Sequence, residues 1–314
     1  MQSARTVFMF SGQGSHYYQM GRQLLEQDPG FRDCLHSLDE VARRISGKRV
    51  LDAVLAGGKA DVFDRTLLTH PAIFMFEYAL AQRLIAGGLR PDLVLGASLG
   101  TFVAAVIAGS VDVEDALAAV IHQAKAFEAH CERGGMIAIL ATPALYAEPF
   151  LSEHSELAAL NFEGHFAVAA ALPSLEPIEA ELKRRGISHQ RLAVSYAFHS
   201  RWIDAARDDF RAFMGGLPVR PPRLPLICCA RAAALDRLGA EDFWHVVRHP
   251  IRFREALAAL EAQGPHRYVD LGPSGTLATF VKYALPKDSA SSAHATLTPY
   301  GQDARNLAAV LALA

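Results

Sequence analysis

The apolar positions of this 314-residue chain fall into two kinds of segment that alternate along most of its length. Short apolar runs predict buried strands, and longer runs with apolar residues at helical spacing predict helices. The predicted strands cover 6–10, 92–96, 226–229 and 268–271. The predicted helices cover 16–27, 70–86, 100–109, 199–214 and 240–248, with further helices ending near 130 and 262 and one beginning at 275. Alternation of this kind predicts an α/β fold.

The pattern changes in the middle of the chain, where strands and helices follow the order β-α-β-β-α-β. The predicted strands are 135–140, 157–161, 166–171 and 191–196, and the predicted helices are 143–151 and 173–185. This order is that of the ferredoxin-like unit. We therefore predict a small subdomain over 133–197, inserted into a large α/β subdomain made of 1–132 and 198–314.

Composition narrows the classes of function. The chain is 51% hydrophobic, which suffices for a sizeable core, and its net charge of −2 predicts no nucleic-acid partner. No apolar run is long enough to span a bilayer, and the N-terminus has no signal-peptide pattern, so we expect no membrane association. Four cysteines without a Cys-x-x-Cys pair are typical of reduced thiols in a cytoplasmic protein.

Ser98 carries the clearest chemical signal. It lies in Gly96-Ala97-Ser98-Leu99-Gly100, between a predicted strand and a predicted helix. A Gly-x-Ser-x-Gly in this context is typical of a nucleophile elbow, in which the glycines permit a sharp turn and the serine sits at a helix N-terminus. There its hydroxyl can attack a carbonyl while backbone N–H groups hold the oxyanion. The alternative is a plain tight turn.

A serine nucleophile needs a base, and His199 is the best-placed of the 13 histidines because it lies where the small subdomain returns to the large one. The alternative is a surface or structural histidine. No acidic residue stands out as a third member. Since His122 and His130 have no third ligand nearby, and since Tyr17 occupies the last glycine position of a G-x-G-x-x-G, we predict no metal and no dinucleotide site.

Five motifs together resemble one family. They are Phe10-Ser11-Gly12-Gln13-Gly14-Ser15, the Ser98 elbow, Gly134-Gly135-Met136, Tyr196-Ala197-Phe198-His199-Ser200 and Asp270-Leu271-Gly272-Pro273. Their order and spacing resemble those of malonyl-CoA:acyl-carrier-protein transacylases and polyketide synthase acyltransferases. The resemblance covers nearly the whole chain and implies an α/β-hydrolase-like large subdomain with an inserted ferredoxin-like small one.

The resemblance also implies roles for residues. Ser98 resembles the family nucleophile and His199 its base, whereas Gln13 and Leu99 resemble the residues whose backbone N–H groups form the oxyanion hole. The carbonyl of His249, before Pro250-Ile251-Arg252-Phe253, corresponds to the group that orients the base. Asn161 lies near a family asparagine at the cleft; the alternative is a turn residue at the end of a strand. No bound cofactor is implied, since the acyl group arrives on phosphopantetheine, carried by an acyl carrier protein or by CoA.

Three departures from the family pattern concern the substrate pocket. Relatives that select malonyl or methylmalonyl groups carry an arginine on the helix after the elbow, where this chain has Gln123. A neutral amide cannot pair with a carboxylate, and a broken buried ion pair costs about 3–5 kcal/mol. Ala97 stands where most relatives have histidine. Tyr196 and Phe198 form a hybrid of the motifs typical of malonyl and methylmalonyl selection, so this segment favours neither.

An arginine-to-glutamine change resembles the trans-acting acyl hydrolases of polyketide pathways. We therefore predict hydrolysis of small neutral acyl groups from acyl carrier proteins, through an acyl-serine. The alternatives are an acyltransferase that loads a malonyl or an unusual neutral acyl unit, and a non-catalytic protein that binds carrier proteins. We expect a monomer. The basic residues expected to meet an acidic carrier protein are Arg191, Arg201 and Lys282.

Overall fold

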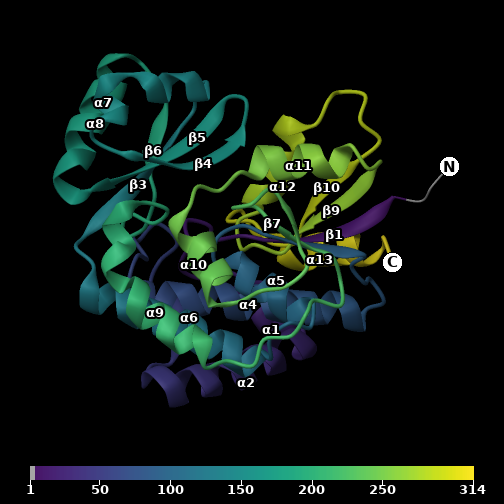
Figure 1. Cartoon of the computed structure of the whole chain (residues 1–314). Coiled ribbons are helices and arrows are strands. Elements are labelled where there is room, and N and C mark those ends of the chain that lie inside the picture. Colours follow the sequence, from purple (N-terminus) through teal and green to yellow (C-terminus); the bar gives the residue numbers. More distant parts are fainter. Residues whose placement is uncertain (1–3) are drawn as a thin grey trace.

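A computed structural model describes residues 4–314, which form two sheets with their covering helices (Figure 1). The larger sheet has the order β10-β9-β1-β2-β7-β8. All neighbouring strands in it are parallel except β8, which pairs antiparallel with β7. Its strands are β1 (Arg5–Phe10), β2 (Leu93–Gly96), β7 (Leu226–Cys228), β8 (Ala233–Leu235), β9 (His266–Asp270) and β10 (Ser292–Ala295).

Alternate residues of β1 face opposite layers of helices, because side chains in a strand alternate between the faces of a sheet. Phe8 and Phe10 belong to the core shared with α2, α4, α5 and α6, whereas Val7 and Met9 pack with α11 and α12. The helices of this subdomain are α1 (Arg22–Gln27), α2 (Pro29–Ser46), α3 (Val50–Ala56), α4 (Thr66–Ala86), α5 (Gly100–Ile107), α6 (Val113–His130), α9 (Arg207–Gly215), α10 (Ala240–Arg248), α11 (Phe253–Glu261), α12 (Thr276–Ala284) and α13 (Asp303–Leu311).

The smaller sheet lies at the upper left of Figure 1 and is antiparallel, in the order β4-β5-β3-β6. Its elements are β3 (Gly134–Ile139), β4 (Glu156–Phe162), β5 (His165–Ala171), β6 (His189–Arg191), α7 (Pro149–Ser152), α8 (Leu172–Arg184) and the 3₁₀ helix η1 (Pro143–Ala147). Ile137, Phe166 and Val168 pack against Leu175 and Ile178 of α8. The predicted ferredoxin-like order within an α/β protein is confirmed.

The two sheets are joined by backbone. Ile251 forms a parallel bridge with Ala159 of β4. Its N–H donates to the carbonyl of Ala158 at 2.9 Å, and its own carbonyl accepts from Leu160 N–H at 2.7 Å. The edge strand of the small sheet is therefore attached to the segment that follows α10.

Several predicted boundaries are wrong. The last strand of the small sheet is β6 at His189–Arg191 rather than 191–196, because residues 192–200 leave the sheet as bends and turns. The predicted helix at 199–214 is divided into the 3₁₀ helix η2 (Arg201–Ala206) and α9. The helix predicted from residue 70 begins at Thr66. Five elements were not predicted: α2, α3, β8, β10 and α13.

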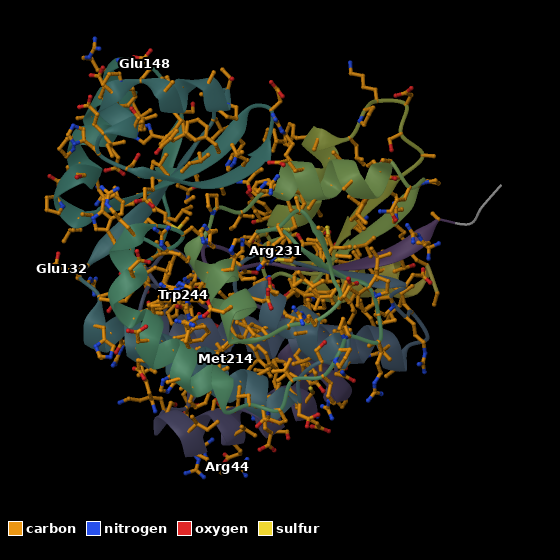
Figure 2. The ribbon with its side chains drawn as sticks, viewed as in Figure 1. Arg44, Glu132, Glu148, Met214, Arg231 and Trp244 are labelled. Carbon is orange, nitrogen blue, oxygen red and sulfur yellow. The ribbon has the colours of Figure 1, made fainter. Side chains whose placement is uncertain are left out.

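Charged side chains such as Arg44 and Glu148 lie at the outside of the ribbon, whereas Met214 of α9 and Trp244 of α10 are buried (Figure 2). The four cysteines are free thiols. Within residues 4–314, no helix combines the length and apolar character needed to cross a bilayer.

Candidate active site

Ser98 occupies a strained turn between β2 and α5. Its φ is 55°, a left-handed conformation that residues other than glycine seldom adopt. A Cβ on Gly96 would lie 2.4 Å from Thr101 Cα, and one on Gly100 would lie 2.2 Å from the carbonyl oxygen of Phe10. Both glycines of the motif are thus required sterically, as an elbow demands. Because β1 and β2 are parallel with Phe10 opposite Gly96, the loop after β1 lies beside this turn.

His199 lies directly against Ser98. The Ser98 Oγ is 2.8 Å from His199 Nε2, and the His199 Nδ1 is 2.8 Å from the backbone oxygen of His249. A carbonyl only accepts, so Nδ1 carries the hydrogen and Nε2 offers its lone pair to the serine. Burial lowers the pKa of His199 to about 4, opposed by the hydrogen bond to the His249 backbone and assisted by the charges of His249 and Arg248. The imidazole is therefore neutral near pH 7, as a general base must be.

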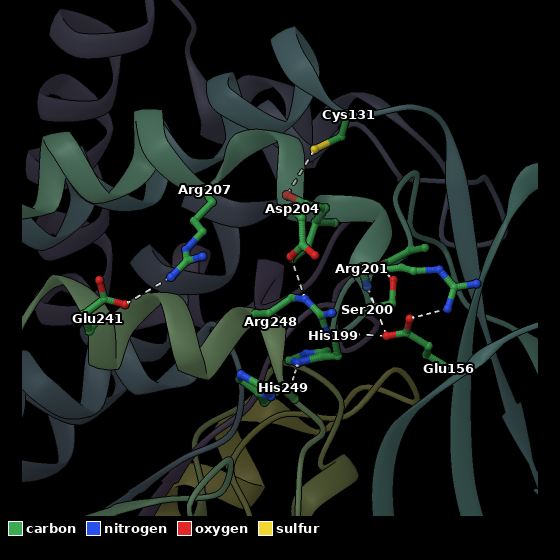
Figure 3. Close-up of polar contacts among 12 residues, drawn as sticks. Cys131, Glu156, His199, Ser200, Arg201, Asp204, Arg207, Glu241, Arg248 and His249 are labelled. Carbon is green, nitrogen blue, oxygen red and sulfur yellow. Dashed lines mark hydrogen bonds and ion pairs between the residues drawn. The ribbon is translucent and has the colours of Figure 1, made fainter.

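An ionic network surrounds the histidine (Figure 3). Arg248, which precedes the orienting His249, contacts Asp204 Oδ1 through Nε at 2.6 Å and Glu156 Oε2 through Nη1 at 3.4 Å. Arg201 contacts the other oxygen of Glu156 at 2.8 Å. Asp204 is thus engaged with Arg248, and the His199 Nδ1 is engaged with the His249 carbonyl, so the site needs no third acidic residue.

Two backbone N–H groups close to the serine have no hydrogen-bond partner. Among residues 4–314, neither Gln13 N–H nor Leu99 N–H donates to a protein acceptor. The Gly12–Gln13 backbone lies against the elbow, since a Cβ on Gly12 would be 2.8 Å from Ser98 Cβ. The Gln13 side chain turns away and donates from Nε2 to Thr69 Oγ1 at 2.9 Å. Free N–H groups beside a serine are the arrangement that an oxyanion hole requires.

A cavity of about 230 Å³ opens above Ser98 between the two sheets. Both subdomains contribute to its wall, which is formed by Ser11, Gly12, Gln13, Gly14, Ser15, Ala97, Ser98, Met136, Ala138, Ala159, Asn161, His165, Ala167, Gln190, Leu192, Phe198, His199, Ile251, Thr276, Leu277 and Phe280. Within the described part of the chain, this wall contains no Lys, Arg, Asp or Glu. A ligand in the cavity would meet apolar surface and neutral polar groups.

Of the predicted pocket residues, Ala97, Asn161 and Phe198 line the cavity, and Asn161 Nδ2 lies 2.9 Å from His165 Nδ1. Gln123 and Tyr196 are not among the residues that line it, so their assignment to the substrate pocket stays a prediction.

Phe127, Tyr196 and Phe198 form an aromatic cluster, of which Phe198 lines the cavity. Phe127 lies one helical turn beyond Gln123 and packs on Phe198 with ring centroids 5.3 Å apart. Tyr196 packs on Phe127 and Phe198. Gln123 is 1% exposed, and its Nε2 has no hydrogen-bond partner in residues 4–314.

Most of the other cavity residues were not predicted, and among them His165 and Phe280 form a contact across the cleft. They contact each other at 5.0 Å between ring centroids although they come from different subdomains. No local motif marks either one, so only the packing of the subdomains could have identified them.

The surface cations expected near the cleft differ in their partners. Arg191 is paired with Glu179, and Arg201 with Glu156. Lys282 forms no ion pair with any residue in 4–314, and it alone of the three keeps a free charge. No cluster of metal-ligating side chains occurs in the same residues.

Comparison with known proteins gives consistent results. The family described as the acyl transferase domain matches residues 7–313. The polyketide biosynthesis acyltransferase homolog BaeD of Bacillus velezensis is 44% identical over 304 residues, which span 96% of this chain and 94% of that protein. The polyketide biosynthesis acyltransferase homolog PksD of Bacillus subtilis is 41% identical over 304 residues, which also span 96% of this chain and 94% of that protein. The malonyl-CoA:acyl carrier protein transacylase of Xanthomonas oryzae pv. oryzae superposes with a TM-score of 0.83 at 26% identity, covering 98% of this chain and 99% of that one.

Proposed function

The chain belongs to the acyl transferase family, and we propose that it removes acyl groups from acyl carrier proteins in polyketide biosynthesis by hydrolysing their thioesters. The reaction uses an ester on Ser98. Acyl carrier proteins are the expected partners, because the relatives are named for polyketide biosynthesis and the similar structures include carrier-protein transacylases.

The first half of the reaction makes the ester. Ser98 Oγ attacks the thioester carbonyl while His199 Nε2 takes the serine proton, and the His249 carbonyl holds the imidazolium through Nδ1–H. The N–H groups of Gln13 and Leu99 stabilise the oxyanion. The C–S bond then breaks, and His199 returns the proton to the departing pantetheine thiol.

The second half consumes the ester. Water attacks the acyl carbon, His199 takes a proton from that water, and the C–O bond to Ser98 breaks as the proton passes to its oxygen. The products are a free carboxylic acid and the original enzyme.

The observation that carries the choice of substrate is the uncharged wall of the cavity. A malonyl group would bring a carboxylate into this space with no Lys or Arg from residues 4–314 to meet it. An unpaired charge in a buried site costs about 3–5 kcal/mol. Short neutral acyl groups such as acetyl and propionyl meet no such cost.

An acyltransferase is the second candidate, and the names of the two Bacillus relatives favour it. The acyl-serine would be the same, but a second carrier-protein thiol would replace water as the acceptor. The acyl unit loaded would be malonyl or an unusual neutral group.

The test is to incubate the protein with acetyl-, propionyl- and malonyl-loaded carrier protein and to follow free acid by mass spectrometry. Hydrolysis predicts rapid release of acetate and propionate, little malonate, and no release with Ser98→Ala. Transfer to a second carrier protein without free acid would reject the hydrolase in favour of the transferase.

A further inference from the structure

Glu77 is a fully buried carboxyl group beside the loop that follows β1. It lies on α4 among apolar neighbours and is 0% exposed. Its Oε1 accepts the Ser11 backbone N–H at 2.7 Å and lies 2.7 Å from Ser11 Oγ, while Oε2 has no partner. No Lys or Arg in residues 4–314 pairs with it. Burial therefore raises the pKa of Glu77 well above its usual range, despite the opposing Ser11 contacts, and Asp270 raises it further.

The oxygen atoms around Glu77 form a chain that leads to the Gly12 carbonyl. Ser11 Oγ, besides its contact with Glu77, lies 2.9 Å from Ser15 Oγ. Ser15 Oγ in turn lies 2.8 Å from the backbone oxygen of Gly12. Each of these distances is that of an O–H···O hydrogen bond.

The number of hydrogens available identifies the protonation state of Glu77 that fits this series of oxygen–oxygen contacts. Three oxygen–oxygen contacts need three hydrogens, but the hydroxyls of Ser11 and Ser15 supply only two and a carbonyl supplies none. With an ionised Glu77, one of the three contacts would bring two oxygens together without a hydrogen between them. A protonated Glu77 supplies the missing hydrogen.

We propose that Glu77 is a protonated positioning residue that begins a relay running from its own O–H through Ser11 Oγ–H and Ser15 Oγ–H to the carbonyl oxygen of Gly12. The relay acts on the oxyanion hole because Gly12 C=O and Gln13 N–H belong to one planar trans peptide and point in opposite directions. Holding the oxygen from behind aims the N–H at the space beside Ser98. Successive hydrogen bonds also polarise one another, which strengthens the last donor.

The packing around Ser11 supports a fixed arrangement. A Cβ on Gly272 would lie 2.4 Å from Ser11 Oγ, so the strand-end segment after β9 closes directly on this hydroxyl. Ser11 and Ser15 are 3% and 4% exposed. The hydroxyls therefore have little freedom to exchange their protein partners for bulk water.

This proposal rests on the proposed acyl-serine chemistry. It does not depend on whether water or a carrier-protein thiol finally accepts the acyl group, because the relay assists formation of the ester. The measurement is accordingly the single-turnover rate at which propionyl-loaded carrier protein acylates Ser98, followed by intact mass. This rate exists for a hydrolase and for a transferase alike. Failure of the hydrolase proposal would appear only later, as an ester that does not release free acid.

Three variants separate the relay from mere packing. Glu77→Met removes the first hydrogen bond and Ser15→Ala the last. Glu77→Gln keeps a neutral amide that can still donate an N–H to Ser11 Oγ, but it loses the acceptor for Ser11 N–H, because Oε1 of Glu77 makes both contacts. We expect Glu77→Met and Ser15→Ala to slow acylation about tenfold or more with little change in KM, short of the 10²- to 10³-fold loss that follows removal of an oxyanion donor. Glu77→Gln should retain more of the rate than Glu77→Met, because it keeps a donor for Ser11 Oγ.

Ser155→Ala is the matched control. Ser155 is 3% exposed and donates from Oγ to a backbone oxygen, that of Leu151, at 2.6 Å, but it lies outside the cavity wall in the small subdomain. Its rate should equal that of the parent protein. If Glu77→Met fails to fold, Ser15→Ala still decides the matter. A parental rate in Ser15→Ala, or equal losses in Glu77→Gln and Glu77→Met, would overturn the relay.

An infrared difference spectrum detects the protonation state of Glu77 directly. Subtracting Glu77→Gln from the parent protein at pH 7 should leave the carbonyl-stretch band of a protonated carboxylic acid. The paired bands of a carboxylate in its place would contradict the proposal.

Discussion

Gly12→Ala tests whether the loop after β1 sets the geometry of the Ser98 site. The added Cβ would lie 2.8 Å from Ser98 Cβ, 3.1 Å from the Ala97 oxygen and 3.3 Å from Ser98 Oγ. The first of these is roughly half an ångström or more nearer than ordinary contact between carbon atoms allows. Ser98 is fixed between β2 and α5, so the loop itself must move away.

That movement displaces the Gln13 N–H from the position where the oxyanion forms. A misplacement of about 1 Å at an active site can cost about 100-fold in rate, so we expect Gly12→Ala to lower the acylation rate about 10- to 100-fold. Overpacking of this size costs about 1–3 kcal/mol of unfolding free energy, which leaves a folded protein.

The assay is single-turnover acylation by propionyl-loaded carrier protein, with urea unfolding measured in parallel. Gly215→Ala is the control, because a Cβ there has no atom within 4 Å. That variant should acylate at the parental rate and keep or gain stability, by about 0.4–1 kcal/mol. A parental rate in Gly12→Ala would refute the reasoning, since it would show that the loop does not determine the catalytic geometry.

Three further predictions concern charge. Because the pKa of His199 is lowered to about 4, kcat/KM should be flat from pH 5 to 8 and fall only near pH 4; an acid limb near pH 6.5 in the pH–rate profile would contradict this. Burial lowers the pKa of His16 to about 4 and of His70 to about 3, so the unfolded state binds more protons below pH 6.5. Stability should be complete above pH 6.5 and decline as pH falls, by about 3 kcal/mol per histidine at pH 4. Urea unfolding at pH 7 and 4.5 measures this decline, and His70→Gln should lessen it. Malonyl-loaded carrier protein should acylate Ser98 about 10²- to 10³-fold more slowly than the propionyl form, and Gln123→Arg should raise the malonyl rate. Because Gln123 does not line the cavity, no gain would mean either that the arginine does not reach it or that the cavity rejects malonate for another reason.

The parts of the site that were predicted correctly in space are those encoded by short segments. The Ser98 turn depends on Gly96 and Gly100 and on the strand and helix that flank them, and all of this lies within a few residues. The positions of His199 and the His249 carbonyl came from longer motifs and their order. The contact between His199 and Ser98 could be seen only in the structure, because 101 residues separate the two in the sequence.

The sequence does not determine which residues line the cavity or which charged side chains form ion pairs, because both depend on contacts between segments that are far apart in the chain. Gln123 and Tyr196 are placed in the pocket by alignment of sequence motifs alone, and neither is among the residues that line the cavity. Arg191 and Arg201 are candidates for meeting an acidic carrier protein, and the fold gives each of them an acidic partner within the chain, Glu179 and Glu156.

Some missed features did leave a signal. In α2, Phe31, Leu35, Leu38 and Ala42 recur at helical spacing and are buried, so the 3.6-residue period could have identified this helix. Glu77 gave a weaker signal in the sequence, since one acidic residue in a mostly apolar helix indicates only that a polar group must contact it. Its partner Ser11 comes from a different element, and only the structure shows them together.

The fate of the acyl group on Ser98 tests the central claim most directly. Propionyl-Ser98 protein would be prepared by brief exposure to propionyl-loaded carrier protein, separated, and mixed with an unloaded phosphopantetheinyl carrier protein in ¹⁸O-labelled water. Hydrolysis of propionyl-Ser98 by water predicts that the ester is converted to propionate carrying one ¹⁸O atom, with little propionyl on the added carrier protein. Quantitative appearance of propionyl on that carrier protein, with no labelled acid, would contradict it.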